Sequence, residues 1–340
     1  MVRELHKIYV GRDMESHAIY FSGSSEGLGK NEIVLGVNPR SPLNIFRIRR
    51  ILRTFQSKAK AELIVHVHLT WPFFYVTLAS LGLSRVRLVY TEHNTSNKRR
   101  NIPLLWILER LLYGRYRRII CISQGVHDSL SKWVGQRVAQ RLVTIPNGSR
   151  IYSLAQRPPL DGRLPQLVSI GSLSARKNFA TAILALAQLR GEIARYTIIG
   201  EGPERSRLEA IIHREQLEDK VQLVGWSETV ENYLHEADIQ LVPSLWEGFG
   251  LVAVEGMSTG LPVVASNVDG LREVLDQSNP SVTLINKVDS VDDWVAGIRK
   301  AITDLRTTGA TYLAHSSRRQ AEKFTLDEMA ERYLSVYREQ

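Results

Sequence analysis

Two glutamates, Glu247 and Glu255, are separated by seven residues in the run Pro243-Ser-Leu-Trp-Glu-Gly-Phe-Gly-Leu-Val-Ala-Val-Glu. An apolar run typical of a strand ends near Pro243, and a helical pattern begins near Gly250. We therefore expect Glu247 on the connecting loop and Glu255 inside the helix. The unpaired amides at such a helix start attract a phosphate, whereas carboxylates accept hydrogen bonds from sugar or ribose hydroxyls. The spacing predicts a site for a ligand that carries both phosphate and hydroxyl groups.

The elements that would hold this site are regular from about residue 165 onward. Short apolar runs alternate there with segments of helical period, which predicts a parallel sheet with helices on both faces. The strands are expected at Leu167–Ile170, Tyr196–Ile199, Val221–Val224, Ile239–Val242, Pro262–Ala265 and Val282–Ile285. The helices are expected at Ala180–Leu189, Glu204–Glu215, Val230–Glu236, Leu251–Thr259, Val291–Asp304 and Leu326–Arg338.

The first half alternates in a similar but less regular way. Its strands are expected at Leu63–His68, Arg87–Thr91 and Arg118–Ser123. Its helices are expected at Leu104–Tyr113 and Gly125–Trp133. The turn signal Pro146-Asn-Gly and the later Pro158-Pro indicate a domain boundary near residues 146–165. We expect a first domain over residues 1–150, a second over 151–318, and a C-terminal helix over 319–340 that returns to the first domain. Two doubly wound domains of this kind face a cleft in which ligands bind.

Composition limits the classes of protein to consider. With 340 residues, 44% apolar and 23% charged, the chain has the profile of a globular protein with two domains. The single cysteine, Cys121, excludes an internal disulfide framework and a multi-cysteine metal site. A net charge of +9 favours an anionic partner, or else only keeps the surface soluble. No membrane span or signal segment is recognisable, so a cytoplasmic location is expected.

The run from Glu247 to Ser266 resembles the E-x7-E signature of the retaining glycosyltransferase family 4, which has the GT-B fold. The first glutamate opens Glu-Gly-Phe-Gly-Leu, and the second is followed by Gly-Met-x-x-Gly-Leu-Pro-Val-Val-Ala-Ser. The resemblance extends over roughly residues 35–335 and is strongest from 167 to 275. It implies an α/β protein with two Rossmann-like domains. The implied activity is transfer of a sugar from a nucleoside diphosphate to a hydroxyl, with retention of configuration.

The resemblance also implies which residues of the second domain bind the donor. Glu247 would bind hydroxyls of the transferred sugar, and Glu255 would bind the ribose. Further donor contacts are expected from Gly171, Ser172, Gly200, Gly202, Val224, Gly225, Gly248, Phe249, Gly250 and Leu251. Several of these are glycines, which let the backbone approach a ligand closely.

Two cations would neutralise the leaving diphosphate, where charge develops in the transition state. Lys177 matches the family's lysine, but Ser172 stands where the family has an arginine beside its glycine. Arg176 is expected to supply the missing charge, because a guanidinium can reach across a turn. The alternative is that Arg176 and Lys177 are ordinary solvated charges of a loop.

Three histidines lie near strand ends in the first domain. His93 follows the strand Arg87–Thr91, and family members often carry a histidine there that faces the transferred sugar; a polar loop residue is the alternative. His66 and His68 alternate on one strand and share a face, which favours a structural role. No third ligand lies near them in the sequence, and no metal or other cofactor is expected.

A basic and apolar stretch in the first domain suggests a second kind of partner. Lys98-Arg-Arg precedes the apolar segment Ile102–Leu108, and further arginines follow at 110, 115, 117 and 118. An amphipathic element with cationic flanks can lie on an anionic bilayer, at the inner face of the membrane. A core helix with solvated charges is an equal alternative. Nucleic acid is not expected as a partner, because no nucleic-acid motif accompanies the charge.

The beginning of the sequence departs from the family order, in which a strand, a Gly-rich loop and a helix come first. Here Val2–Leu5 is predicted to be the end of that first helix, and Lys7–Val10 the second strand. Val34–Val37 is predicted to be the third strand, and Pro42–Phe55 the helix that follows it. One strand-helix unit, about 25 residues, is therefore expected to be absent. The consequence would be an open or rearranged first sheet and poor activity, unless Ala18–Ser22 fills the gap.

The sequence thus predicts a retaining glycosyltransferase that uses a UDP- or GDP-sugar. Its acceptor is expected to be a glycan, in particular a lipid-linked one in surface-polysaccharide or O-antigen assembly. One alternative is a non-catalytic partner subunit, which Ser172 and the incomplete first domain favour. Another is a sugar-nucleotide epimerase of the same fold, which does not account for the run around Glu247.

Overall fold

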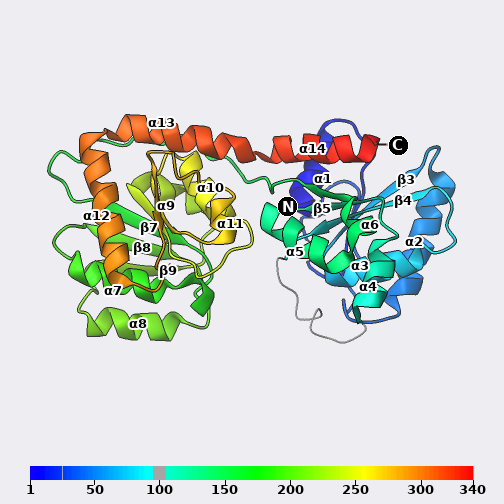
Figure 1. Cartoon of the computed structure of the whole chain (residues 1–340), viewed down its shortest axis with the longest axis horizontal. Coiled ribbons are helices and arrows are strands. Elements are labelled where there is room, and N and C mark those ends of the chain that lie inside the picture. Colours follow the sequence, from blue (N-terminus) through cyan, green and yellow to red (C-terminus); the bar gives the residue numbers. More distant parts are fainter. Residues whose placement is uncertain (25, 95–104, 340) are drawn as a thin grey trace. The chain divides into compact units, whose positions relative to one another are not determined.

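The computed structural model describes residues 1–24, 26–94 and 105–339, and these form two compact units. Unit 1 comprises Met1–Gly148 and Leu326–Gln340, and unit 2 comprises Ser149–Thr325. Each unit has a parallel sheet with helices packed against it (Figure 1). The chain passes between the units twice at neighbouring points, since Ser149 and Thr325 form a parallel bridge.

Unit 2 contains a six-stranded parallel sheet in the order β12-β11-β10-β7-β8-β9. Counted along the chain within the unit, this is the doubly wound order 3-2-1-4-5-6. The strands are β7 (Gln166–Ile170), β8 (Arg195–Ile199), β9 (Val221–Gly225), β10 (Ile239–Val242), β11 (Val263–Ser266) and β12 (Val282–Ile285). All six predicted strands are confirmed, because continuous apolar runs are what a sheet covered on both faces requires.

Helices cover both faces of this sheet (Figure 1). They are α7 (Phe179–Gln188), α8 (Arg205–Arg214), α9 (Val230–Glu236), α10 (Leu251–Ser258), α11 (Asp269–Arg272), α12 (Val291–Thr307) and α13 (Ala310–Ala321), with the short 3-10 turns η2 (Ala175–Lys177) and η3 (Glu322–Phe324). Successive residues of β7 separate the two layers: Leu167 belongs to the larger core with α7, α8 and α12, and Val168 packs with Leu234 of α9. The predicted helices are confirmed, whereas α11 and α13 were not expected.

Unit 1 divides its strands between two sheets. Four parallel strands run in the order β3-β4-β5-β6, and a separate parallel pair consists of β1 and β2. Their bounds are β1 (Ala18–Tyr20), β2 (Glu32–Val34), β3 (Leu63–His68), β4 (Val86–Glu92), β5 (Arg118–Cys121) and β6 (Leu142–Thr144). The first sheet is therefore open within the described residues, as expected, and Ala18–Tyr20 does not join the larger sheet.

Two expectations about the early strands are wrong. Lys7–Val10 is not a strand but part of one continuous helix, α1 (Val2–Gly11). Its apolar residues Leu5 and Tyr9 recur at helical spacing and pack against the sheet, so the 3.6-residue period decides over the β-branched composition. The strand expected at Val34–Val37 lies earlier, at Glu32–Val34.

The helices of unit 1 pack on opposite faces of its larger sheet. They are α1, α2 (Asn44–Lys58), α3 (Thr70–Ala79), α4 (Leu105–Tyr113), α5 (Gln124–Val134), α6 (Gln136–Ala139) and α14 (Leu326–Arg338). On one face α1 and α14 bury Val89 of β4. On the other face Tyr90 lies in an aromatic cluster with Phe73, Tyr113 and Tyr116. Alternate residues of one strand thus serve two cores.

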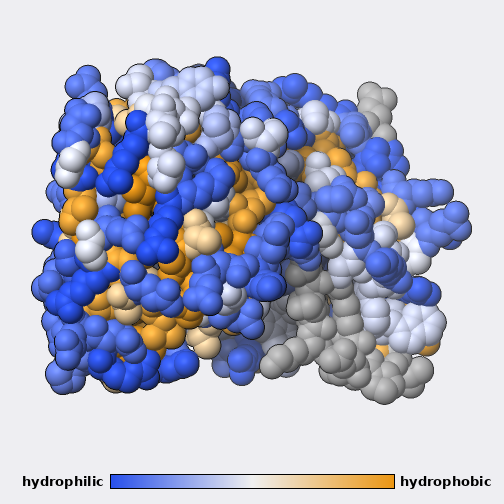
Figure 2. All heavy atoms as spheres, turned by 60° about the vertical axis from the view of Figure 1, so that its left-hand side comes forward, coloured by the Kyte–Doolittle hydropathy of each residue, from blue (hydrophilic) through white to orange (hydrophobic). Residues whose placement is uncertain are grey.

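No described helix is both long and apolar enough to cross a bilayer. On the face shown in Figure 2, apolar atoms are interspersed with hydrophilic side chains. A mixture of this kind is usual for a folded domain, since polar groups are too few to cover its whole surface.

Candidate active site

The carboxylate of Glu247 is the centre of a polar cluster in unit 2. Its side chain is only 9% exposed. Arg176 Nη1 donates to Oε2 at 3.1 Å, and the Ser244 hydroxyl donates to Oε1 at 2.7 Å. Lys177 Nζ donates to Oε1 as well. Burial of a carboxylate is unfavourable unless charged and hydrogen-bonded partners surround it, and here two cations and one hydroxyl do so.

The sheet order explains why these residues meet. Arg176 and Lys177 lie in η2 after β7, and Glu247 lies on the loop after β10. β7 and β10 are neighbours in the sheet, and the chain leaves them in opposite directions, so their loops separate at a topological switch point. Ligands of doubly wound sheets bind at this point. A backbone hydrogen bond of 2.8 Å from Leu245 N–H to the Arg176 carbonyl joins the two loops.

The side chain of Lys177 is held against the backbone at Gly171, directly after the end of β7. Its side chain passes over Gly171, where a Cβ would come within 2.9 Å of Lys177 Cε. The residue is 8% exposed, and Asn178 after it adopts the left-handed conformation, with φ of 51°. Asn178 is anchored by a 2.9 Å hydrogen bond from its Nδ2 to the Val288 carbonyl. Gly171 therefore makes room for the lysine, which cannot be an ordinary solvated loop charge.

Arg176 also has a defined position. Its guanidinium carbon lies 4.7 Å from the ring centroid of Trp246, within the range of a cation–π interaction. Ser172 is exposed, and its hydroxyl lies 3.2 Å from that of Ser174. Arg176 is thus fixed beside Glu247 while position 172 lacks a cation. This agrees with the expected compensation by Arg176, which stays a prediction.

Glu255 lies on α10 and is influenced by the same lysine. Burial raises the pKa of its carboxyl above the ordinary value, and the positive charges of Arg150 and Lys177 oppose this shift. Burial and then the charge of Glu255 raise the pKa of the Tyr152 hydroxyl. Glu255, Lys177 and Glu247 therefore form one electrostatic group at this end of the sheet.

The start of α10 supplies backbone donors to the same region. Gly250 precedes the helix with φ of 73°, a conformation that glycine adopts without strain. A Cβ there would also lie 2.8 Å from a methyl of Leu271. The first amides of α10, at Leu251 and Val252, have no carbonyl partner within the helix, and both residues are half-exposed. They can bind an anion.

The predicted glycines line the adjoining edge of the sheet. Gly200 N–H donates to the Gly225 carbonyl at 2.8 Å, and a Cβ at Gly200 would lie 2.0 Å from the Gly171 carbonyl oxygen. A Cβ at Gly202 would lie 2.3 Å from the carbonyl oxygen of Leu173. Only glycine allows this packing of successive strand ends.

Two other predicted groups of residues differ in exposure. Val224 is half-exposed at the end of β9, next to Trp226, which is 69% exposed. Gly248 is half-exposed, whereas Phe249 is buried edge-to-face against Phe324 at a centroid distance of 5.8 Å. Any contact from Phe249 to a ligand must therefore use its backbone.

His93 belongs to unit 1, where it is part of a chain of aromatic rings. Its Nε2 lies 3.2 Å from Nδ1 of His68, whose ring centroid lies 4.3 Å from that of the tilted His66 ring. His66 Nε2 lies 2.7 Å from the Thr91 hydroxyl, and its Nδ1 from the Tyr337 hydroxyl at 2.5 Å. Burial lowers the pKa of His66 to about 3 and that of His93 to about 4. These rings are neutral at pH 7.

The histidine cluster agrees with a structural role for His66 and His68, and it links them to His93, which the sequence did not suggest. No group of three or more metal-ligating side chains with suitable geometry occurs among residues 1–24, 26–94 and 105–339. The 25-residue separation of His68 and His93 hides their contact, which depends on the pairing of β3 with β4.

Sequence reasoning missed several other residues of the cluster. Ser244 is fully buried and bonds Glu247, Trp246 stacks on Arg176, and Arg150 acts on Glu255. Gly270 is also involved, because a Cβ there would lie 2.2 Å from the Glu247 carbonyl oxygen. Only Ser244 and Trp246 could have been suspected, from their closeness to Glu247 in the sequence.

The basic and apolar stretch of unit 1 is described in part. Lys98-Arg-Arg and Ile102–Leu104 lie outside the described residues. The remainder enters α4, where Trp106, Ile107, Leu108 and Leu111 are exposed. Arg110 lies 4.5 Å from the Trp106 ring centroid and donates to the Trp133 carbonyl at 3.0 Å.

Comparison with known families assigns both units. Residues 153–320 match the family described as glycosyl transferases group 1, and residues 12–150 match the Glycosyltransferase Family 4. Together with the parallel sheets of the two units, these matches place the chain among the GT-B glycosyltransferases of the family 4-like type.

Particular proteins similar to the chain include the GPI3 subunit of phosphatidylinositol N-acetylglucosaminyltransferase from Saccharomyces cerevisiae. The two are 26% identical over 309 residues, which is 86% of this chain and 66% of that protein. The amylovoran biosynthesis glycosyltransferase AmsK of Erwinia amylovora is 37% identical over 123 residues, 33% of this chain and 30% of AmsK. In neither case does the similarity span two thirds of the relative's length.

Solved structures share the fold. A glycosyltransferase from Rickettsia africae ESF-5 has a TM-score of 0.85 at 18% identity, covering 99% of this chain and 93% of the other. HepE of Anabaena, solved in complex with UDP-glucose, has a TM-score of 0.74 at 18% identity, covering 95% and 99%. These likenesses confirm the predicted GT-B architecture.

Proposed function

We propose that this glycosyltransferase binds a nucleoside diphosphate sugar at the switch point of unit 2 and transfers the sugar to a hydroxyl with retention of configuration. The observation that carries the proposal is the buried Glu247 carboxylate held between Arg176 and Lys177. Two cations and a carboxylate at one point suit a ligand that joins a diphosphate to a polyhydroxylated ring.

The present pairing defines what the donor must displace. Without a ligand, the single Glu247 carboxylate pairs with both Lys177 and Arg176, so the three groups keep one net positive charge. A diphosphate carries more negative charge than one carboxylate, so both cations would turn toward it. Glu247 would then accept hydrogen bonds from sugar hydroxyls, while Glu255 would accept them from the ribose. The cations thereby stabilise charge on the leaving group in place of a metal ion.

In the transfer step the bond from the anomeric carbon to the diphosphate breaks, and the diphosphate leaves with the bonding electrons. A new bond forms from the anomeric carbon to the acceptor hydroxyl oxygen, whose proton passes to an oxygen of the departing diphosphate. We assign His93 to the transferred sugar on the strength of the family resemblance. Its neutral ring at pH 7 can accept or donate a hydrogen bond without adding charge.

The relatives favour particular substrate classes. HepE binds UDP-glucose, and AmsK acts in amylovoran biosynthesis. We therefore propose a UDP- or GDP-sugar as donor and a lipid-linked glycan as acceptor, in surface-polysaccharide or lipopolysaccharide assembly. The protein would work in the cytoplasm, at the inner face of the membrane.

A non-catalytic partner subunit is the second candidate. Ser172 in place of the family's arginine favours it, as does the similarity to a protein that is itself named as a subunit. Arg176→Ala, Ser172→Arg and the double variant separate the candidates. If Arg176 supplies the charge, the first variant loses turnover and the second change restores it. A silent Arg176→Ala combined with a gain from Ser172→Arg contradicts the compensation.

The decisive experiment measures sugar transfer directly. UDP- and GDP-sugars are first compared by thermal shift, and the stabilising donor is incubated with lipid-linked glycans and excess chelator. The expected result is a product whose new linkage has the anomeric configuration of the donor, as read by NMR. An inverted product, or turnover lost with chelator and restored by a divalent metal, would contradict this mechanism. Donor binding without any turnover would favour the subunit.

A further inference from the structure

The outward face of α2 carries cations without neighbouring carboxylates. Arg50, Arg53 and Lys58 are exposed on this helix, and the three-residue spacing of Arg50 and Arg53 makes these two neighbours on its surface. Between residues 33 and 61 the sequence contains seven Lys and Arg residues and no Asp or Glu. The cations therefore have no local carboxylate to neutralise them.

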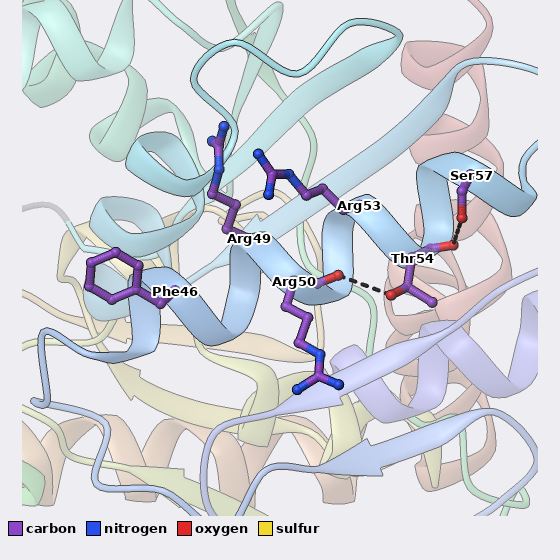
Figure 3. A pocket seen from close by; sticks show the side chains of 6 residues that line it. All are labelled: Phe46, Arg49, Arg50, Arg53, Thr54 and Ser57. Atoms are coloured by element: carbon purple, nitrogen blue, oxygen red, sulfur yellow. Dashed lines mark hydrogen bonds between the residues drawn. The ribbon is translucent and has the colours of Figure 1, made fainter.

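A hollow of about 420 Å³ runs along this face. Figure 3 shows the side chains that line it: Phe46, Arg49, Arg50, Arg53, Thr54 and Ser57. Arg49 and Arg53 extend to one side of the helix and Arg50 to the other. The hydroxyls of Thr54 and Ser57 donate to backbone carbonyls of α2 at 3.0 and 2.9 Å. Guanidinium groups are thus the main donors left for a ligand in the hollow.

The three arginines of the hollow have different partners. Arg49 Nη1 donates to the carbonyls of Ala79 at 2.9 Å and Leu81 at 2.7 Å, which ties α2 to the end of α3. Within the described part of the chain, Arg50 and Arg53 have no ion pair and no side-chain hydrogen bond. One arginine therefore fixes the helix, while two remain available to a ligand.

Apolar side chains are exposed beside these arginines. Phe46 is 71% exposed and Leu43, at the start of α2, is 59% exposed. Leu81, whose carbonyl bonds Arg49, is 47% exposed. A helix with free cations and bulky apolar residues on its outer surface suits the interface of a bilayer, where both find partners. A nucleic acid would engage the cations and leave the apolar side chains in water.

We propose that the outward face of α2, from Leu43 to Lys58, docks the protein on a bilayer rich in anionic phospholipids. Arg50 and Arg53 contact lipid phosphates, and Leu43 and Phe46 enter the headgroup region. The surface is distinct from the cluster around Glu247 and from α4, so the inference does not depend on the transfer reaction.

The test compares sedimentation of the full chain with two kinds of vesicle, phosphatidylcholine alone and phosphatidylcholine with phosphatidylglycerol. Wild-type protein should bind the second kind more strongly, and less so at high salt. Arg50→Gln/Arg53→Gln should reduce its partition coefficient roughly thirty-fold, because each cation contributes on the order of 1 kcal/mol near such a surface. Phe46→Ala should weaken binding with little change in salt dependence.

A matched control removes the same charge elsewhere. Lys287 and Arg306 are exposed in unit 2, and Lys287→Gln/Arg306→Gln should leave vesicle binding unchanged. Circular dichroism and nucleotide binding should be the same for all variants. Equal vesicle binding by wild type and Arg50→Gln/Arg53→Gln, equal binding to both vesicles, or equal losses in both double variants would overturn the proposal. The proposal would also be overturned if Arg50→Gln/Arg53→Gln lost binding to duplex RNA but kept its binding to vesicles.

Discussion

Unit 2 joins six strands in one sheet and gathers its charges at the ends of β7 and β10, whereas unit 1 divides its strands between two sheets. Of the seventeen large apolar side chains exposed among the described residues, twelve belong to unit 1. Exposed apolar residues indicate a docking surface only where they lie together, as Leu43 and Phe46 do on α2 beside Arg50 and Arg53. The comparison teaches that two parallel α/β sheets can differ in what they present: a buried polar cluster in unit 2, and in unit 1 the apolar and cationic surface that we propose for docking.

The units also differ in how burial acts on their ionisable groups. In unit 1 burial lowers the pKa values of His66, His68 and His93, so that these rings stay neutral. In unit 2 burial raises the pKa of Glu255, although Arg150 and Lys177 oppose the change. The contribution of Glu255 to stability should therefore respond to pH with the opposite sign to that of the buried histidines.

Removing a large core side chain should have the largest effect and should affect one unit at a time. Phe73 in unit 1 and Trp294 in unit 2 are fully buried. Replacing either by Ala should lower the free energy of unfolding of its own unit by about 3–5 kcal/mol. Hydrogen exchange of peptides from each unit, measured in urea, reports this separately. Tyr312→Ala, at an exposed position, is the control. Equal destabilisation of both units by either variant would show that they unfold as one.

Changes in the charged cluster of unit 2 should reduce turnover while leaving both folds intact. Glu247→Gln and Lys177→Ala should each lower kcat by about 10²–10³, as expected when a preorganised charged group is lost. Nucleotide binding should change less in Glu247→Gln, because the variant leaves Lys177 and Arg176 free for the diphosphate. Glu228→Gln, an exposed carboxylate in the same unit, is the matched control. Wild-type kcat in both variants would remove these residues from the site.

Glu255→Ala should act on donor binding rather than on the chemical step. Loss of a charged acceptor for the ribose hydroxyls should weaken binding of the nucleotide sugar by about 1.5–3 kcal/mol. Isothermal titration with the nucleoside diphosphate and with the matching 2′,3′-dideoxy analogue tests the contact. The analogue should bind wild type and variant alike. A variant that still prefers the natural nucleotide to the same degree would show that Glu255 does not bind the ribose.

The smallest expected effect is the pH response of unit 1. An unfolded histidine takes up a proton near pH 6.5, but the folded His93 does so only near pH 4. The unfolded state therefore gains protons first, and the stability of unit 1 should fall as pH decreases through this window. From pH 7 to pH 6 the loss should be about 0.7 kcal/mol per buried histidine. Unfolding of unit 1 by urea at the two pH values measures it.

The response of unit 2 provides the contrast. The raised pKa of Glu255 means that this carboxyl keeps its proton to higher pH in the folded state than in the unfolded state. The stability that Glu255 contributes is therefore lost as pH rises above about 4.5.

His93→Asn should remove part of the acid sensitivity of unit 1 and leave unit 2 unchanged. If unit 1 is equally stable at pH 6 and pH 7, its histidines are not kept neutral by burial.

Local pattern was sufficient to predict most elements. The strands of unit 2 are continuous apolar runs flanked by turns, and Ile239–Val242 and Val282–Ile285 were predicted to the residue. Strand and helix periods are properties of neighbouring residues, so they can be read without knowing the fold. The wrong prediction of a strand at Lys7–Val10 has the same origin, because four residues are too few to distinguish the period of a strand from that of a helix. In the folded chain this segment is helical and packs against α14.

The sequence by itself determined which residues could do chemistry, because the seven-residue spacing of Glu247 and Glu255 and the pair Arg176-Lys177 are local features. Only the tertiary structure decided that Lys177 and Glu247, seventy residues apart, form a hydrogen-bonded ion pair, and that the Ser244 hydroxyl donates to the same carboxylate oxygen. The physical reason is the order of the sheet. β7 and β10 are adjacent in space though two strands lie between them in the chain, and no local pattern specifies which strands pair across such a distance.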